Sequence, residues 1–422
     1  MSSAARPPRQ ARLVLLDVGG DPVGRLGPVE VASPWWPDVE PLVHAVREQH
    51  GLDVLVLRVL APAADDGSRE PVGGAVTYLA QSTRALTAEE LAGLEPPPAA
   101  VLGDALDDHP LRAPWARPGG PTSILTWADD VLSRAGTPRT APAEQVKTWN
   151  LSSILRLPTA RGPVWCKSAP PFFAHEGAII AAVAARHPRL VPHLLAADPA
   201  TGTVLMADVP GEDQWSAGPA RLADMVEAVV DLQDEWVGRA DELLALRLPD
   251  WRGPALAGAL SALLARDDVR DRLEPRELDG VDGLAARLPA LVAELDACGL
   301  GDTLVHGDLH AGNWRYGPGG LLLLDWGDSG VGHPLLDLPA FLERLPGDQQ
   351  DAVRAGWVRQ WRARRPDADV ERAIALVPPL AALRQALIYR TFLDRIEPDE
   401  RIYHRDDPPV WIRRALQLSA TD

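Results

Sequence analysis

One segment of the chain, residues 303–338, limits the fold more than any other part. Its sequence is TLVHGDLHAGNWRYGPGGLLLLDWGDSGVGHPLLDL, and the residues around it have a mostly helical pattern. Inside the segment, a Gly-Pro-Gly-Gly turn separates two short runs, Trp314–Tyr316 and Leu321–Leu324, which predicts a β-hairpin. This hairpin would return Asp325, at the end of the second run, to the side of Asn313.

Oxygen-bearing side chains gather in this predicted hairpin and in the loop before it. Asp308 lies on the loop, and Asn313 and Asp325 would face one another across the hairpin. Carboxylate and amide oxygens suit Mg²⁺, which needs few protein ligands when substrate phosphates supply the others. Turn chemistry alone rarely produces H-G-D-x-x-x-x-N followed by four apolar residues and Asp at hairpin spacing. The segment therefore predicts a magnesium site rather than an ordinary surface loop.

Two other kinds of site fit the same segment less well. His306, His310 and His333 could be proposed as zinc ligands together with Asp308, but no His-Glu-x-x-His spacing and no nearby thiolate accompany them. A Ser–His–Asp hydrolase lacks its Gly-x-Ser-x-Gly turn. The carboxylate and amide pair is thus the site that the sequence favours.

Composition and charge restrict the class of protein. The chain has 422 residues, 46% of them hydrophobic and 24% charged, which suits two or three folded domains and argues against wholesale disorder. The net charge of −17 disfavours nucleic acid as a partner. No apolar stretch is long enough to span a bilayer, and the first residues lack the apolar core of a secretory signal. With two cysteines only, a cytoplasmic protein without a membrane partner is expected.

Lysine is almost absent from this chain. Of 42 basic residues only Lys147 and Lys167 are lysines, which leaves 42 − 2 = 40 arginines. Lysine is a compact point charge on a slim stem, whereas arginine is a broad planar fork. Where arginine is used so freely, a retained lysine suggests a position that arginine cannot fill. Lys147 lies in a polar segment, whereas Lys167 lies in a run with a strand pattern, Val164–Ser168.

The hydrophobic pattern predicts an α+β fold with three domains. Residues 1–130 would form a small α/β domain of unknown role that ends at a linker over residues 110–123. Residues 140–211 would form a β-rich lobe with a hairpin around Lys167. Residues 212–422 would form a helical lobe that contains the loop and hairpin of residues 303–338.

Three motifs of the segment stand in a characteristic order: HGDLHAGN at residues 306–313, LLLDWGD at 322–328 and GHPLLDL at 332–338. They resemble the signature of the aminoglycoside phosphotransferase/choline kinase superfamily, which shares the protein-kinase-like fold. The resemblance covers about residues 148–418 and leaves out roughly the first 130. It implies a bilobal kinase-like fold and Mg-ATP-dependent phosphorylation of a hydroxyl on a small molecule.

The resemblance also implies roles for single residues. Asp308 would be the catalytic-loop aspartate, which receives or orients the proton of the acceptor hydroxyl, while Asn313 and Asp325 would hold the Mg²⁺ ions that bridge the nucleotide phosphates. Lys167 would bind the α- and β-phosphates of ATP, held in place by Glu176 of the following helix. In that role a slim point charge is required, which explains the retained lysine.

Other features of the family are less complete here. Residues 205–209 would connect the two lobes, and the backbone of Ala207 and Val209 could bond adenine. The candidate phosphate loop, PTARGP at residues 158–163, has one glycine instead of the Gly-x-Gly-x-x-Gly pattern. Asp337 stands just before a proline and an apolar run, which fits a helix N-cap, while the resemblance implies that it supports the catalytic loop.

The acceptor is expected on the helical lobe, after about Trp215. Acidic residues there could favour a cationic acceptor such as an amino sugar or aminoglycoside, although acidity also serves solubility: Glu212, Asp213, Asp234 and Glu235.

A rival interpretation is a catalytically inactive kinase-like protein that binds nucleotide or regulates. Such a protein would be expected to lack the base or a metal ligand, but these residues are all present. A further alternative places the function in the first 130 residues, as a small-molecule sensor or a dimerisation module. The sequence leaves the oligomeric state open.

Overall fold

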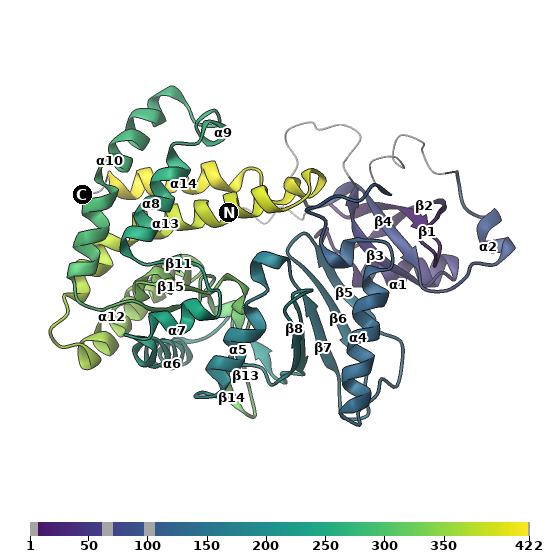
Figure 1. Cartoon of the computed structure of the whole chain (residues 1–422), viewed down its shortest axis with the longest axis horizontal. Coiled ribbons are helices and arrows are strands. Elements are labelled where there is room, and N and C mark those ends of the chain that lie inside the picture. Colours follow the sequence, from purple (N-terminus) through teal and green to yellow (C-terminus); the bar gives the residue numbers. More distant parts are fainter. Residues whose placement is uncertain (1–6, 61–70, 97–105, 421–422) are drawn as a thin grey trace. The chain divides into compact units, whose positions relative to one another are not determined.

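The computed structural model describes residues 7–60, 71–96 and 106–420 (Figure 1). The chain has the mixed α+β fold that was predicted, and it divides into two compact units. The first unit comprises the residues up to Gly177, with Leu194–Asp208 and Arg395–Arg405. The second comprises the rest: Ala178–His193, Val209–Asp394 and the residues from Asp406 onward. The three domains expected from the sequence stay a prediction.

The first unit opens with a four-stranded sheet of order β2–β1–β4–β3. β1 (Arg9–Leu16) lies parallel to β4 (Gly74–Ser82), and the other neighbours, β2 (Pro22–Val31) and β3 (Val54–Leu60), are antiparallel. β1, β3 and β4 were predicted. β2 was not, because its sequence PVGRLGPVEV carries the prolines and glycines that usually mark turns.

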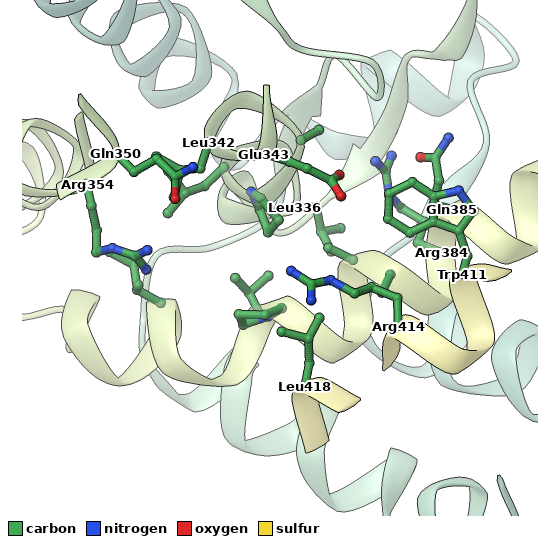
Figure 2. Close-up of a pocket in the computed structure, with 18 residues that line it drawn as sticks. Leu336, Leu342, Glu343, Gln350, Arg354, Arg384, Gln385, Trp411, Arg414 and Leu418 are labelled. Atoms are coloured by element: carbon green, nitrogen blue, oxygen red, sulfur yellow. The ribbon is translucent and has the colours of Figure 1, made fainter. Parts of the chain in front are cut away.

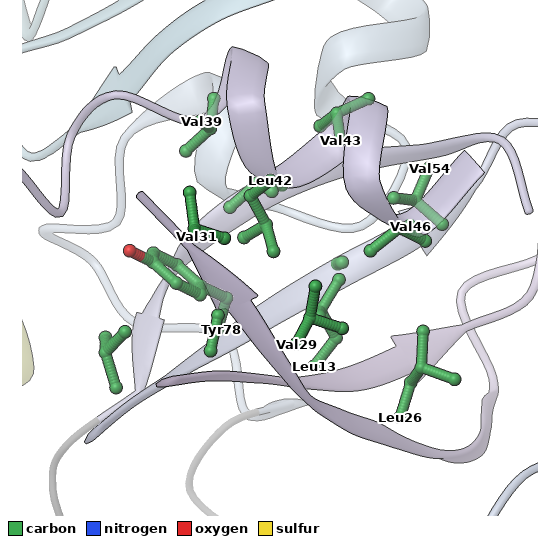
Figure 3. Close-up of a cluster of buried hydrophobic side chains, with 14 of the residues drawn as sticks. Leu13, Leu26, Val29, Val31, Val39, Leu42, Val43, Val46, Val54 and Tyr78 are labelled. Atoms are coloured by element: carbon green, nitrogen blue, oxygen red, sulfur yellow. The ribbon is translucent and has the colours of Figure 1, made fainter. Parts of the chain in front are cut away.

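A hydrophobic core fills the space between this sheet and helix α1 (Glu40–His50), as Figure 3 shows. Leu42, Val43 and Val46 recur at helical spacing and are buried toward the strands. Leu13 of β1 is among the strand residues that meet them. This core holds together the sheet and the helix that the α/β pattern predicted.

A five-stranded antiparallel sheet forms the other part of the first unit. Its order is β5–β6–β7–β9–β8, and its strands are these: β5 (Glu144–Trp149), β6 (Ser152–Leu157), β7 (Val164–Ser168), β8 (Leu194–Asp198) and β9 (Thr203–Ala207). The predicted hairpin around Lys167 is confirmed as β6 and β7.

Helix α4 (Gly120–Arg134) packs on this sheet through Ile124, Ala128 and Leu132. The linker predicted over residues 110–123 is therefore wrong from Gly120 onward. Pro121, which suggests a turn in the sequence, lies in the first turn of the helix. A proline is tolerated there because the backbone N–H groups of the first turn have no hydrogen-bond partner within the helix.

A segment near the end of the chain, residues 395–405, completes the first unit. Its carboxylates surround the buried Arg58 of β3: Asp399 lies 3.2 Å from the guanidinium, and Glu397 lies 3.9 Å from it. Glu400 accepts a hydrogen bond from the backbone N–H of Val59 at 3.2 Å and is itself buried. Burial outweighs the attraction of Arg58 and raises the pKa of Glu400 to about 8.

This raised pKa makes stability depend on pH. The folded chain holds the Glu400 proton that the unfolded chain releases near pH 4.5, so this residue lowers the free energy of unfolding as the pH rises from about 4.5 to about 8. Glu400→Gln cannot titrate, so its free energy of unfolding should not fall in this pH range. Relative to the native protein, the variant should therefore gain about 2 kcal/mol of stability from pH 5 to pH 7. Denaturant unfolding of both proteins at several pH values measures this difference, and a difference independent of pH would contradict it.

The second unit is mostly helical, as predicted. α6 packs against α12, and α8 packs against α10. The helices are α6 (Pro219–Trp236), α7 (Ala240–Ala245), α8 (Gly253–Leu264), α9 (Asp267–Arg270), α10 (Pro275–Ala297), α11 (Leu338–Glu343), α12 (Gly347–Arg364), α13 (Val370–Arg395) and α14 (Asp407–Ser419).

Two small sheets interrupt these helices and carry the segment 303–338. One has the order β10–β13–β14 and the other β11–β15–β12. Their strands are β10 (Glu212–Asp213), β11 (Asp250–Trp251), β12 (Thr303–Val305), β13 (Trp314–Gly317), β14 (Gly320–Leu323) and β15 (Gly330–Gly332). Among the described residues, no helix combines the length and the apolar character that a membrane crossing needs.

Candidate active site

The predicted hairpin of the second unit is confirmed as β13 and β14. Trp314 pairs with Leu323, and the backbone N–H of Leu324 donates to the carbonyl of Asn313 at 2.8 Å. Asp325 follows directly, so its backbone lies one residue from this bond. Its φ of 65° falls in the left-handed region, which non-glycine residues adopt rarely and often at functional sites.

Asn313 fixes the loop that carries Asp308. Its side-chain Nδ2 donates to the backbone carbonyl of Asp308 at 2.8 Å and lies 3.5 Å from the Asp308 carboxylate. The amide nitrogen is thus used inside the protein, which leaves the amide oxygen as the atom that a cation can bind. Oxygens of this amide and of the Asp325 carboxylate are of the kind that Mg²⁺ prefers, and their role as metal ligands stays a prediction.

A cation at this position would need further ligands. In the described parts of the chain, no three His, Cys, Asp or Glu side chains are grouped so that they hold a metal by themselves. Nucleotide phosphates and water supply such ligands at magnesium sites. Two histidines of the zinc alternative have structural partners instead: His306 Nε2 bonds the carbonyl of Leu324 at 3.0 Å, and His333 Nδ1 accepts from the N–H of Leu335 at 3.3 Å.

Asp308 lies between two basic side chains. His310 Nε2 is 3.5 Å from one carboxylate oxygen, and Arg344 Nη2 is 3.6 Å from the other. Burial acts to raise the pKa of Asp308, but the hydrogen bond and charge of His310 and the charge of Arg344 outweigh it and lower the pKa to about 2. Asp308 is therefore ionised at neutral pH. Trp215 stacks on the His310 ring with 4.8 Å between centroids.

The loop before Asp308 is held from two sides. The carboxylate of the fully buried Asp337 accepts from the backbone N–H groups of His306 and Gly307, both at 2.9 Å. Arg384 Nη2 donates to the carbonyl of Gly307 at 2.9 Å. A Cβ at Gly307 would lie 1.8 Å from the carbonyl oxygen of Asp328, so only glycine fits there.

These contacts correct one interpretation and add one residue. Asp337 stands at the N-cap of helix α11 as predicted, but its side chain makes no capping hydrogen bond and supports the loop instead, as the resemblance implied. Arg384 was missed by the sequence analysis. The one feature of the sequence that could have indicated it is the position of this arginine within a mostly apolar stretch of α13. In the structure Arg384 is fully buried, and its guanidinium lies 4.5 Å from the centre of the Trp251 ring.

Lys167 and Glu176 form the predicted ion pair in the first unit. The ammonium of Lys167, on β7, lies 2.6 Å from Glu176 Oε1, and Glu176 opens helix α5 (Glu176–Ala184). The side chains are 13% and 4% exposed, so this is a largely buried pair. The contact is confirmed, while its role with a nucleotide stays a prediction.

The predicted connection between the lobes coincides with the boundary between the two units. Ala207 ends β9 in the first unit, opposite Val164 of β7. Val209 begins the next stretch of the second unit, where its carbonyl accepts from Arg315 Nη2 at 3.4 Å. Adenine binding by the backbone of Ala207 and Val209 stays a prediction.

The acidic residues expected near the acceptor fall into two groups. Asp234 pairs with Arg365 at 2.8 Å, and Glu235 pairs with Arg186 at 2.9 Å. These two carboxylates therefore serve ion pairs of the helical unit. Glu212 and Asp213 are exposed and form β10, next to β13 of the hairpin.

The chain matches the model of the APH phosphotransferase enzyme family over residues 142–374, more than half of its length. No curated protein matches it. The chain is also similar to solved structures, three of which are the following. A macrolide 2′-phosphotransferase from Brachybacterium faecium is 19% identical and covers 66% of this chain and 95% of its own, with a TM-score of 0.47. A choline/ethanolamine kinase family protein from Mesorhizobium loti is 18% identical and covers 71% of this chain and 100% of its own, with a TM-score of 0.46. An ethanolamine kinase from Plasmodium vivax is 10% identical and covers 66% of this chain and 82% of its own, with a TM-score of 0.49.

The family model spans the five-stranded sheet, the Lys167–Glu176 pair, the loop of Asp308 and the β13–β14 hairpin. It leaves out the N-terminal four-stranded sheet, as the resemblance of the motifs did. The chain belongs to the phosphotransferase enzyme family that includes aminoglycoside phosphotransferases and choline kinases.

Proposed function

We propose that this protein is a Mg-ATP-dependent kinase that phosphorylates a hydroxyl of a small molecule. The observation that carries the proposal is the loop and hairpin of the second unit. There an ionised Asp308 is fixed by Asn313, and the hairpin returns Asp325 to the same place. A base and two oxygen ligands in one short segment are the parts that phosphoryl transfer needs.

In this proposal Asp308 acts on the acceptor. Its carboxylate would accept the proton of the acceptor hydroxyl while that oxygen forms a bond to the γ-phosphorus. The bond from this phosphorus to the β-γ bridging oxygen breaks, and ADP leaves. The low pKa of Asp308 keeps it in the ionised form that this step requires.

The remaining residues would bind and orient the nucleotide. The amide oxygen of Asn313 and the carboxylate of Asp325 would hold Mg²⁺, which, when bound, offsets the negative charge of the phosphates. The ammonium of Lys167 would contact the α- and β-phosphates, and Glu176 would keep it in one position.

The function is tested by a screen for acceptors. Purified protein is mixed with Mg-ATP and a panel of hydroxylated compounds (amino sugars, aminoglycosides, choline, homoserine, macrolides and sugar acids), and ADP release is measured. Release that depends on one acceptor supports the kinase. Nucleotide binding without release for any acceptor would favour the inactive, regulatory protein.

The acceptor class is a separate matter. The amino sugar or aminoglycoside suggested by the acidic residues stays a prediction, and Asp234 and Glu235 no longer support it because arginines pair with them. Glu212 and Asp213 are the residues on which it now rests.

Metal dependence gives a second test. Nucleotide binding by the native protein should be stronger with Mg²⁺ than without it, and Asp325→Ala should lose most of this difference, because one of the two oxygen ligands is gone. Calorimetric titration with ATP, with and without Mg²⁺, measures both effects. Asp282→Ala, which removes an exposed carboxylate paired with Arg270, is the matched control. Equal ATP affinity in both conditions for the native protein would contradict a kinase-type site.

A further inference from the structure

A cavity of about 260 Å³ lies among the last helices of the second unit (Figure 2). Residues of α11, α12, α13 and α14 form its walls. Apolar side chains such as Leu336, Leu342 and Leu418 line one part of it. The polar lining consists of three arginines, two glutamines, one glutamate and one tryptophan: Arg354, Arg384, Arg414, Gln350, Gln385, Glu343 and Trp411.

The arginines of this cavity differ from most others in the chain. Within the described residues, Arg354 and Arg414 have neither an ion-pair partner nor a side-chain hydrogen bond, although Arg413, one residue earlier, pairs with Glu277 at 2.8 Å. Arg384 is fully buried, and its Nε and Nη1 have no hydrogen-bond partner among the residues that the structure describes. Arg354 is partly exposed and Arg414 is exposed, so the cost of buried donors without a partner applies to Arg384, which a ligand with acceptor oxygens would stabilise.

The charge of the lining is positive. Glu343 is the one carboxylate that faces the three guanidinium groups. The buried Asp337 offsets the charge of Arg384 from outside the cavity, and Glu343 offsets one of the two other guanidinium groups, so the lining keeps one excess positive charge. In a chain with a net charge of −17, this concentration of positive charge selects for an anion.

Two residues of the cavity lining are connected to the surroundings of Asp308. Arg384 donates to the carbonyl of Gly307, the residue before Asp308. Glu343 precedes Arg344, whose guanidinium lies 3.6 Å from the Asp308 carboxylate. Asp308 itself does not line the cavity, but Arg384 of the lining contacts the loop that carries Asp308.

We propose that this cavity binds the acceptor, and that the acceptor carries a carboxylate or phosphate group beside its reactive hydroxyl. The inference rests on the proposed kinase function. Arg354 and Arg414 would pair with the anionic group, and Trp411 would cover part of the carbon skeleton. Figure 2 shows Arg414 extending from α14 between Trp411 and Arg354. An ammonium group on the acceptor would meet guanidinium groups and be repelled.

The test uses four sugars that share one skeleton and differ in charge. Glucuronate, glucose 6-phosphate, glucose and glucosamine are titrated calorimetrically into the full chain without nucleotide. At least one of the two anions should bind about 10-fold or more tightly than glucose, and glucosamine should bind most weakly. The comparison of glucuronate with glucose 6-phosphate shows whether the cavity prefers a carboxylate or a phosphate.

Two variants locate the binding site. Arg414→Gln should lower the affinity for the anion about 10-fold, whereas Arg413→Gln, whose arginine pairs with Glu277, should leave it unchanged. Thermal unfolding of both variants checks that each is folded. Equal binding of all four sugars, preferential binding of glucosamine, or an equal effect of both variants would overturn the proposal, as would no binding of either anion up to about 50 mM.

Mg-ATP binding is measured in the same samples. If Mg-ATP binds while the anions do not, the inference about the acceptor fails and the proposed kinase function stands. If Mg-ATP itself does not bind, the kinase function fails as well.

Discussion

Asp308→Asn is expected to turn over its acceptor about 10²–10⁴-fold more slowly than the native protein while binding ATP almost equally well. The substitution keeps the size of the side chain and removes the negative charge that would accept the hydroxyl proton. Asn313 bonds mainly the backbone carbonyl of residue 308, at 2.8 Å, so the loop should keep its shape. Steady-state kinetics with the acceptor found by the screen, together with ATP titration, measures the two quantities separately.

The controls distinguish a base from a ligand. Asp282→Asn changes an exposed carboxylate that is paired with Arg270, and it should leave turnover unchanged. Because the pKa of Asp308 is about 2, its own protonation should not limit native turnover between about pH 5 and pH 8. Parallel losses of ATP affinity and turnover in Asp308→Asn would show that Asp308 binds metal or holds structure. Native activity in this variant would remove the catalytic role.

Lys167→Ala should weaken productive ATP binding and lower turnover together, and Lys167→Arg should not restore activity. The guanidinium is broader than the ammonium and cannot take its place beside both Glu176 and a phosphate. Lys167→Ala should also destabilise the fold by about 3–5 kcal/mol, because it leaves the buried Glu176 carboxylate without its cation. Kinetics and denaturant unfolding measure the two effects.

Two further variants separate stability from chemistry. Lys167→Ala combined with Glu176→Gln removes both charges, so it should recover much of the lost stability without recovering activity. Lys147→Arg changes the one other lysine, which lies over the Trp149 ring, and should behave like the native protein. Full activity of Lys167→Arg would show that Lys167 is an ordinary lysine of the sheet.

Local spacing explains why some parts of the site could be predicted. The hairpin follows from a glycine-rich turn between two short runs of strand-forming residues. Its register pairs Trp314 with Leu323, which brings the backbone of Asp325 near that of Asn313. The pairing of Lys167 with Glu176, nine residues later, was implied by the family resemblance together with this short spacing. In both cases the partners are near in sequence, so that a pattern of a few residues contains the contact.

Contacts between distant residues could not be predicted in this way. Asp337 has a good helix-capping context, but its carboxylate bonds the backbone 30 and 31 residues earlier. Arg384 reaches Gly307 across 77 residues, and nothing in its neighbourhood on α13 indicates that partner. The cavity beside it depends on four helices at once. Tertiary packing, which no short pattern encodes, decides each of these.

The segment of residues 395–405 has a consequence for how the chain is made. Asp399, which forms an ion pair with Arg58, is synthesised 341 residues after it, and Glu397 is synthesised just before Asp399. At about 5–20 residues per second, at least ten seconds separate the completion of residue 177 from that of residue 395. During this interval the ion pairs of Arg58 with Asp399 and Glu397 cannot form. The first unit thus reaches its final state only after residues 395–405 have been translated.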